Sequence, residues 1–335
     1  MDLTIIWFVL ITVLFIGFFF LEGFDYGVGI LLPFIAKTDQ ERRIIINTIG
    51  PVWDGNEVWM ITAGGALFAA FPHVYATMFS TFYLALFLML LALIMRGVSF
   101  EFRSKHENKS WRSFWDWMIF FGSAVPALLW GVAVTNLIQG LAINEKMIYT
   151  GTFFDLLTPY TIVGGLTFVL VFTFHGAVFL MLRVESAKTI AALRQMAQKI
   201  GIPAALVFVL CMILTYTNTS LFSSMLAASS LCAAAIVFLA SYGCVFTEKY
   251  VPAFVLSSLA IVFTTLAFFA GLFPRLMVSS LNPDWSLTIY NASSSQYTLG
   301  IMTVAALVLV PIVLIYQGWT YWIFRKRVSG KHLEY

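Results

Sequence analysis

The chain has 335 residues, of which 61% are hydrophobic and only 10% are charged. Soluble domains have about 45–50% apolar and about 25% charged residues, so this composition excludes a water-soluble globular protein. The 19 basic residues are too few for a nucleic-acid-binding surface. We therefore expect an all-α polytopic membrane protein, with lipid around it and no nucleic acid bound to it.

Nine apolar runs are long enough to cross the bilayer as helices, which takes about 20 residues each. The runs are continuously apolar and lack the alternation of barrel strands, so a bundle of transmembrane helices is expected. Short turns at 71–73 and 218–220 should make the flanking helices antiparallel neighbours. All nine runs fit one integral membrane domain over residues 1–335. In chain order they cover about residues 4–34, 49–71, 75–101, 114–142, 159–182, 200–217, 222–244, 253–277 and 299–324.

The positions of Lys and Arg predict the orientation, because cytoplasmic loops of membrane proteins are enriched in these residues. With nine spans and the amino terminus outside, only Lys146 and Arg275 of the 19 basic side chains fall on the outer side. Lys331 is among those on the inner side. The carboxyl terminus is then expected in the cytoplasm.

Four carboxylates and one guanidinium interrupt the apolar runs. Glu22 and Asp25 lie late in the first run, Asp54 and Glu57 early in the second, and Arg96 late in the third. The i,i+3 spacing places both acids of each pair on one helical face. At a rise of about 1.5 Å per residue, all five groups should share one layer in the inner half of the bilayer.

Charged groups are costly inside a bilayer and usually mark a functional site or an ion pair within the bundle. The five groups can neutralise one another, and closely spaced acids can also pass protons. The alternative is that they reach the membrane surface, or form an ion pair of purely structural value. Glycines at 23, 27, 29 and 55 favour close helix contact around Asp25 and Asp54.

The histidines and cysteines predict no metal or haem site in this chain. Only His175 lies within an apolar run, and it has no second histidine at its depth. We interpret it as a hydrogen-bonded core residue. The three cysteines form no CxxC pair. Composition and spacing leave two functions open, a proton-coupled transporter and a subunit of an energy-transducing complex.

Four segments closely resemble subunit II of the cytochrome bd-type quinol oxidases. The most specific is the Trp-Asp-Gly-Asn-x-Val-Trp string at 53–59, and the length and the nine spans also agree with that family. The resemblance covers the whole chain. The segments are Gly23-Phe-Asp-Tyr-Gly-Val-Gly29, Gly50-Pro-Val-Trp-Asp-Gly-Asn-Glu-Val-Trp59, Met95-Arg-Gly-Val-Ser-Phe-Glu-Phe-Arg103 and Phe174-His-Gly-Ala177.

The resemblance implies a respiratory complex of the bacterial cytoplasmic membrane that oxidises quinol and reduces dioxygen to water. In the family, subunit I ligates two haem b and one haem d. Subunit II packs against subunit I, often with a small single-span subunit. This chain is then expected to ligate no cofactor and to be catalytic only within the complex. A bound quinone is an additional candidate ligand.

The resemblance also implies a proton path through this chain. By position, Asp25 and Asp54 match family acids implicated in delivering protons from the cytoplasm toward haem d. We add Glu22 and Glu57 because they lie on the same helical faces, although other family members can carry Gln at the position of Glu57.

Two further residues match positions near a proposed dioxygen route through subunit II, and these are Trp59 and Arg96. Two alternative functions stay open beside the oxidase subunit. One is a proton-coupled secondary transporter that works alone, which should show an inverted repeat of broken helices. The other is a purely structural scaffold for the haem-bearing subunit.

Overall fold

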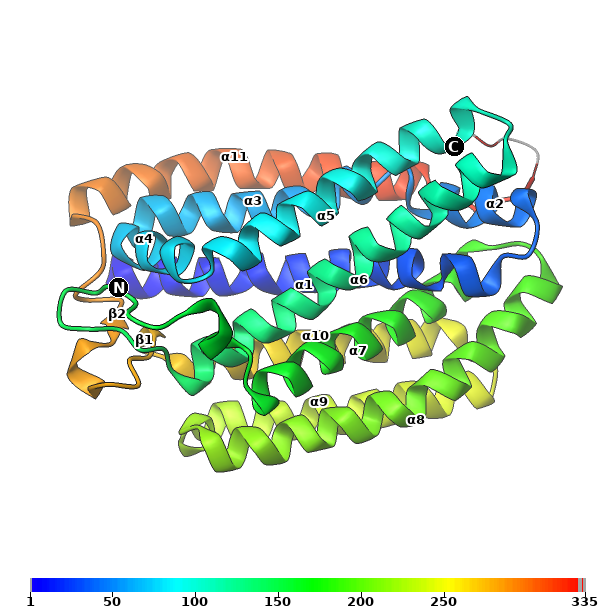
Figure 1. Cartoon of the computed structure of the whole chain (residues 1–335). Coiled ribbons are helices and arrows are strands. Elements are labelled where there is room, and N and C mark those ends of the chain that lie inside the picture. Colours follow the sequence, from blue (N-terminus) through cyan, green and yellow to red (C-terminus); the bar gives the residue numbers. More distant parts are fainter. Residues whose placement is uncertain (1, 331–332, 334–335) are drawn as a thin grey trace.

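The computed structural model describes residues 2–330 and 333, so Lys331 lies outside the described residues. Long helices run along one direction and form a bundle (Figure 1). In the described part, eight helices are long and apolar enough to cross a membrane. The chain is therefore an all-α polytopic membrane protein. The eight helices are α1 (Leu3–Ile35), α5 (Tyr83–Phe102, continued by the short helix η1, Arg103–Lys105), α6 (Lys109–Gln139), α7 (Pro159–Arg183), α8 (Ala187–Asn218), α9 (Met225–Phe246), α10 (Tyr250–Leu272) and α11 (Gln296–Ile323).

The second predicted run forms α3 (Trp53–Ala70), which is not one of these eight helices. Its first two turns carry Asp54, Asn56 and Glu57, so it lacks the long apolar stretch of the others. It nevertheless packs along α1 with one face, while its other face is exposed (Figure 1).

The third predicted run is divided into two helices. α4 (Pro72–Thr81) begins at a proline, which suits the first helical position because proline has no N–H to leave unpaired. The helix is interrupted at Phe82, after which α5 begins. One continuous span over 75–101 was therefore the wrong expectation for this segment.

One helix, α2 (Asp39–Ile49), lies in a segment that the apolar runs left between two spans. Thr38 and Glu41 form a reciprocal capping box at its start. The backbone N–H groups of Lys37 and Thr38 hold the pKa of Glu41 below its ordinary value. α2 buries an apolar face against the bundle, through Ile45, Ile46 and Ile49.

The connection between α10 and α11 is ordered. α10 ends at Leu272, so the eighth predicted run was too long, and β1 (Arg275–Met277) pairs antiparallel with β2 (Leu287–Thr288). The loop after α6 joins this ribbon through a bridge between Leu141 and Ser279. Three short helices, η2 (Phe153–Leu156), η3 (Leu221–Ser223) and η4 (Pro283–Trp285), complete the connections.

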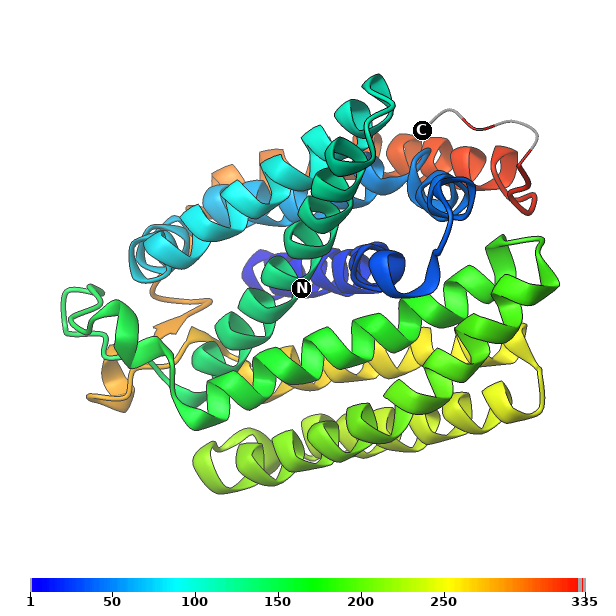
Figure 2. The same cartoon turned by 45° about the vertical axis from the view of Figure 1, so that its right-hand side comes forward.

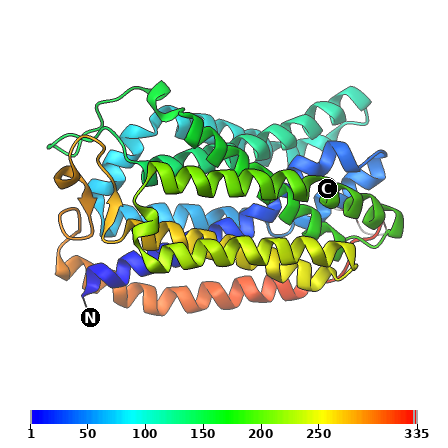
Figure 3. The ribbon, with the colours of Figure 1, turned by 90° about the horizontal axis from the view of Figure 1, so that it is seen from below.

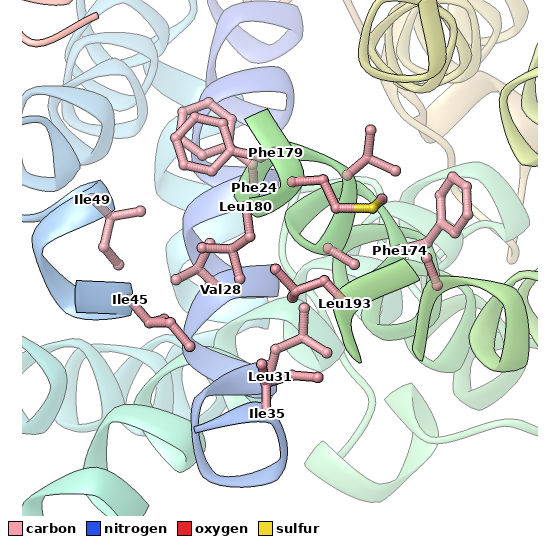
Figure 4. Packing of buried hydrophobic residues seen from close by; sticks show 14 of the residues in the cluster. Phe24, Val28, Leu31, Ile35, Ile45, Ile49, Phe174, Phe179, Leu180 and Leu193 are labelled. Atoms are coloured by element: carbon pink, nitrogen blue, oxygen red, sulfur yellow. The ribbon is translucent and has the colours of Figure 1, made fainter. Parts of the chain in front are cut away.

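Helix α1 lies between two groups of helices. α3, α4, α5 and α11 lie on one side of it, and α7 to α10 lie on the other (Figures 1 and 2). Phe24 and Val28 of α1 pack against Phe179 and Leu180 of α7 (Figure 4). The start of α1 and the end of α11 lie at opposite ends of the bundle (Figures 1 and 3).

The contact of α1 with α7 depends on two glycines. A Cβ atom at Gly176 would lie 2.5 Å from the carbonyl carbon of Gly27, so only glycine allows the two backbones to approach this closely. This close crossing fixes the stretch of α1 that carries the two buried acids.

Candidate functional site

Arg96 lies at the centre of a buried ion cluster. Its side chain is fully buried in α5, and its Nη1 donates to Oε1 of Glu22 at 2.5 Å and to Oε1 of Glu57 at 2.7 Å. Glu22, from α1, is also fully buried, whereas 18% of the Glu57 side chain, from α3, is exposed. One guanidinium therefore joins three helices. We call these three side chains the Arg96 cluster.

Aromatic rings surround the guanidinium. Its carbon lies 5.1 Å from the ring centre of Tyr26, 5.6 Å from that of Phe100 and 6.0 Å from that of Trp53. Such cation–π contacts stabilise a desolvated cation. On the α6 side, a Cβ atom at Gly122 would lie 2.6 Å from the Cβ of Arg96. The charge is therefore enclosed by rings and by close helix packing.

Asp25 belongs to a second, adjoining network. Its Oδ2 accepts a hydrogen bond of 2.6 Å from Nδ2 of Asn56. The carbonyl oxygen of Asn56 accepts from the hydroxyl of Tyr321 at 2.7 Å and from Nε2 of Gln317 at 3.4 Å. Trp59 donates from Nε1 to Oε1 of Gln317 at 2.8 Å. We call these five side chains, from α1, α3 and α11, the Asp25 network.

The two sites interact, since Asp25 is in electrostatic contact with Arg96 as well as with Glu57. Among the described residues, several buried polar atoms around them have no hydrogen-bond partner. Three carboxyl groups face a single guanidinium, so full ionisation would leave uncompensated negative charge in a site of low polarity. The arrangement can therefore hold an exchangeable proton. The unpartnered atoms are Glu22 Oε2, Asp25 Oδ1, Tyr26 Oη and Arg96 Nε and Nη2.

Among the described residues, Asp54 forms no hydrogen bond or ion pair with the other acids or with Arg96, although it interacts electrostatically with Asp25 and Glu57. It is exposed in the first turn of α3, and its Oδ1 accepts from the N–H of Gly55. The buried face of α3 is formed by Asn56, Ala63, Leu67 and Ala70, and Asp54 is not on it. Of the five groups expected in one layer, Glu22, Asp25, Glu57 and Arg96 form the buried part of the site, and Asp25 also accepts a hydrogen bond from the neutral amide of Asn56.

Trp59 and Arg96, the two residues matched to a dioxygen route, belong to different networks. Trp59 covers α1 at Gly17, where a Cβ atom would lie 2.2 Å from the indole ring. Its N–H is used by Gln317.

His175 lies in the core between α7 and α10. Its Nδ1 is 2.8 Å from Oγ of Ser257, and its ring stacks on Phe254 at 5.0 Å between centres. It is a hydrogen-bonded core residue, as interpreted from the sequence. In the described part of the chain, no group of three or more His, Cys, Asp or Glu side chains could hold a metal ion.

Several polar residues of these networks are absent from the sequence-based expectation. Asn56 lies inside the Trp-Asp-Gly-Asn string, and Gln317 and Tyr321 are four residues apart in the last apolar run. Spacing of i,i+4 on one helical face was the available signal for the last two.

A further ion network lies at the end of the bundle that holds α2. Asp116 pairs with Arg103 at 2.6 Å and with Arg42 at 2.5 Å, and Asp39 pairs with Arg103 at 2.8 Å and with Arg112 at 2.7 Å. These contacts join α2, η1 and α6. They include no member of the predicted site.

An apolar cavity of about 750 Å³, open on one side to the surface of this chain, is lined by residues of α1, α3, α4, α5, α6 and α10. Phenylalanine, leucine and methionine side chains form most of its lining, including Phe19 and Met60. The cavity therefore reaches the residue that follows Trp59 in the chain.

Comparisons with known proteins agree over nearly the whole chain. A sequence model described as cytochrome bd terminal oxidase subunit II matches residues 3–324. The cytochrome bd ubiquinol oxidase subunit 2 of Bacillus subtilis (strain 168) is 44% identical over 97% of both chains. The cytochrome bd-I ubiquinol oxidase subunit 2 of Escherichia coli (strain K12) is 40% identical over 99% of this chain and 97% of that protein.

A solved structure has the same fold. A chain in the structure of bd oxidase from Geobacillus thermodenitrificans superposes with a TM-score of 0.79 and 18% identity, covering 97% of this chain and 100% of that chain. The fold, the matched residues and the identities together lead to one conclusion: this chain belongs to the family of cytochrome bd terminal oxidase subunit II.

Proposed function

We propose that this chain carries protons from the cytoplasmic side of a bacterial cell membrane into an oxygen-reducing quinol oxidase. The relatives in the family are named as ubiquinol oxidase subunits, which supports quinol as the electron donor of the complex. The observation that carries the proposal is the shared contact of Glu22 and Glu57 with Arg96, directly beside Asp25.

The chemistry of the site supports this role. An electron that arrives at a buried centre leaves an uncompensated charge unless a proton follows it. The Arg96 cluster and the Asp25 network hold more carboxyl groups than one guanidinium can neutralise. They therefore suit the temporary storage of a proton in the middle of a membrane protein.

The proposed topology has nine spans, namely the eight long helices and α3. The opposite positions of the start of α1 and the end of α11 support an odd number of crossings (Figure 3). Arg42, Arg103 and Arg112 gather at the end that holds α2, which supports a cytoplasmic location for that end and an outer amino terminus. One membrane domain then extends over residues 1–335.

The proposed partner is the haem-bearing subunit I. Asp54 is exposed on α3 beside the exposed apolar side chains of Val58 and Ile61. A carboxylate on an apolar face is costly against lipid, which supports coverage of this face by another protein. Asp54 would then accept protons at the junction of the two subunits. A small single-span subunit stays a prediction.

Among the described residues, the buried His175 does not fit as a ligand of the haem groups that the family implies. The buried imidazole of His175 already bonds Ser257, and the rings of Phe20, Phe24 and Phe254 lie 5.0–6.1 Å from it. This enclosure supports ligation of two haem b and one haem d by subunit I.

A second candidate role is the passage of dioxygen. The observation that favours it is the cavity of about 750 Å³, whose apolar lining suits a small apolar gas and extends to the neighbourhood of Trp59. The same lining suits the apolar tail of a quinone. Mass spectrometry of lipids extracted from the purified complex tests whether a quinone is bound.

The proton role is tested by Asp25→Asn and Asp54→Asn in the assembled oxidase, with oxygen consumption and proton uptake as the measurements. We expect both rates to fall in Asp25→Asn while the haem absorbance stays intact. Unchanged rates in both variants would remove the proposed role. A scaffold would instead lower the yield of assembled complex and leave its turnover unchanged. The transporter alternative predicts activity without any haem-bearing partner.

A further inference from the structure

The hydrogen bonds of the Asp25 network can run in only one sense. An indole N–H can donate but cannot accept. Trp59 therefore requires the carbonyl oxygen of Gln317 to face it, at 2.8 Å, and this directs the Gln317 NH₂ group toward Asn56. The side-chain oxygen of Asn56 must therefore face Gln317 and accept this hydrogen bond.

The same constraint determines which atom faces Asp25. The Asn56 oxygen accepts from Gln317 and from the Tyr321 hydroxyl, at 3.4 and 2.7 Å. Its NH₂ group is left to donate to Asp25 Oδ2 at 2.6 Å. Reversal of the Asn56 amide would bring an oxygen against the carboxyl group and an NH₂ group against the donor from Gln317.

We infer that Trp59, Gln317 and Tyr321 are positioning residues for Asp25, which act by holding the Asn56 amide with its donor toward the carboxyl group. None of the three touches Asp25 by a hydrogen bond. Gln317 and Tyr321 belong to α11. The last helix therefore controls which hydrogen-bond donor faces Asp25 on α1. The inference rests on the proposed proton role of Asp25.

The burial of the network makes this orientation consequential. Asp25 and Asn56 are both fully buried, so bulk water does not replace a lost donor. A network of aligned hydrogen bonds is also stronger than its separate members, because each bond polarises the next. Loss of the Tyr321 hydroxyl or of the Trp59 N–H therefore weakens the hydrogen bond from Asn56 to Asp25, in which neither residue takes part.

The experiment uses the assembled oxidase with Tyr321→Phe and, separately, Trp59→Phe. Tyr316→Phe is the matched control, because it removes the same atom from the same helix at an exposed side chain. We expect oxygen consumption per haem to fall roughly threefold to tenfold in Tyr321→Phe, as for loss of one hydrogen bond, and to stay unchanged in the control.

A spectroscopic measurement separates positioning from a structural role. In the reduced-minus-oxidised infrared spectrum, the carboxyl band that is lost in Asp25→Asn identifies Asp25. We expect this band to shift in Tyr321→Phe and in Trp59→Phe, and to keep its position in Tyr316→Phe. A band that stays in place in both network variants would overturn the inference, whatever happens to the activity.

The two levels of the proposal can fail separately. Normal oxygen consumption in both Asp25→Asn and Asp54→Asn would defeat the proposed function, while the infrared shift would still report how Asn56 is held. Low activity in Asp25→Asn with normal activity and an unshifted band in Tyr321→Phe would leave the proton role intact and defeat the inference.

Discussion

Helices α7 and α11 are both long and apolar, yet they are held in different ways. In the most apolar stretch of α7, 67% of the residues are buried, against 6% in α11. α7 is fixed by backbone contact with α1 at Gly27 and Gly176. In α11 the single buried residue is Leu299, and polar contacts attach the helix near its two ends.

The difference separates two uses of a membrane helix. A helix buried on most sides stabilises the bundle through packing, because there is no hydrophobic effect between helices in lipid and close fit must replace it. A peripheral helix contributes little packing within the chain. Its few polar side chains instead orient particular hydrogen-bond partners on neighbouring helices. In α11, Gln317 and Tyr321 orient the amide of Asn56, which in turn donates a hydrogen bond to Asp25.

The largest effect is expected at the crossing of α7 with α1. Gly176→Val would place side-chain carbon against the backbone of Gly27, which cannot rotate away. We expect no assembled oxidase, measured as haem absorbance in purified membranes. Gly318→Ala in α11 is the control, since the space around Gly318 is open within this chain. Normal assembly of Gly176→Val would contradict the claim that α7, unlike α11, is held by close backbone packing.

The next largest effect is expected for the buried ion pair between Arg96 and Glu22 of α1. Arg96→Leu would leave Glu22 buried without its partner, and removal of one member of a buried ion pair costs about 3–5 kcal/mol. We expect a strongly lowered melting temperature of the complex. The double variant with Glu22→Gln should recover part of the loss, and a double variant no more stable than the single one would argue against an ion pair as the cause.

A smaller effect is expected for the one polar contact between α7 and α10 that involves His175. Ser257→Ala removes the partner of its Nδ1 and leaves a buried ring nitrogen unpaired, which costs about 1–3 kcal/mol. Thermal unfolding of the assembled complex measures the loss. Ser258→Ala, whose hydroxyl bonds only the backbone of its own helix, is the neighbouring control. Equal melting temperatures of the two variants would assign no stabilising role to His175.

The smallest effect is expected where the first turns of α11 are attached to α1. Trp7 donates from Nε1 to the carbonyl oxygen of Leu299 and to the hydroxyl of Thr303, at 3.3 and 3.1 Å. Trp7→Phe should lower the free energy of unfolding by about 0.5–1.5 kcal/mol. Oxygen consumption should not change, because Asn56 is held at the other end of α11. A large loss of activity would mean that the whole helix, and not only the end that carries Gln317 and Tyr321, positions Asp25.

The fold was predictable from the sequence where apolar length was decisive. Eight long helices follow from continuous apolar runs, and the short turn at 218–220 follows from its polar residues. α2 was not predicted, because an 11-residue amphipathic helix has no apolar run. The break at Phe82 was missed as well, since no proline or glycine marks it.

The candidate site was predictable in its charges and less so in its contacts. A buried Arg96 needs acids at its own depth, so Glu22 and Glu57 could be inferred from position alone. The partner of Asp25 could not, because helical spacing does not tell which side of α3 faces α1. Packing through Ala63 and Leu67 turns Asn56 inward and leaves Asp54 exposed. Gln317 and Tyr321 carry no charge and therefore gave no comparable signal.

The proton role itself is tested most directly by time-resolved proton uptake from the cytoplasmic side during reduction of dioxygen, in vesicles that contain the Asp25→Asn oxidase. Slow proton uptake with normal haem content is the predicted result. Uptake as fast as in the unaltered oxidase would show that protons reach the site of oxygen reduction without Asp25 and would contradict the account.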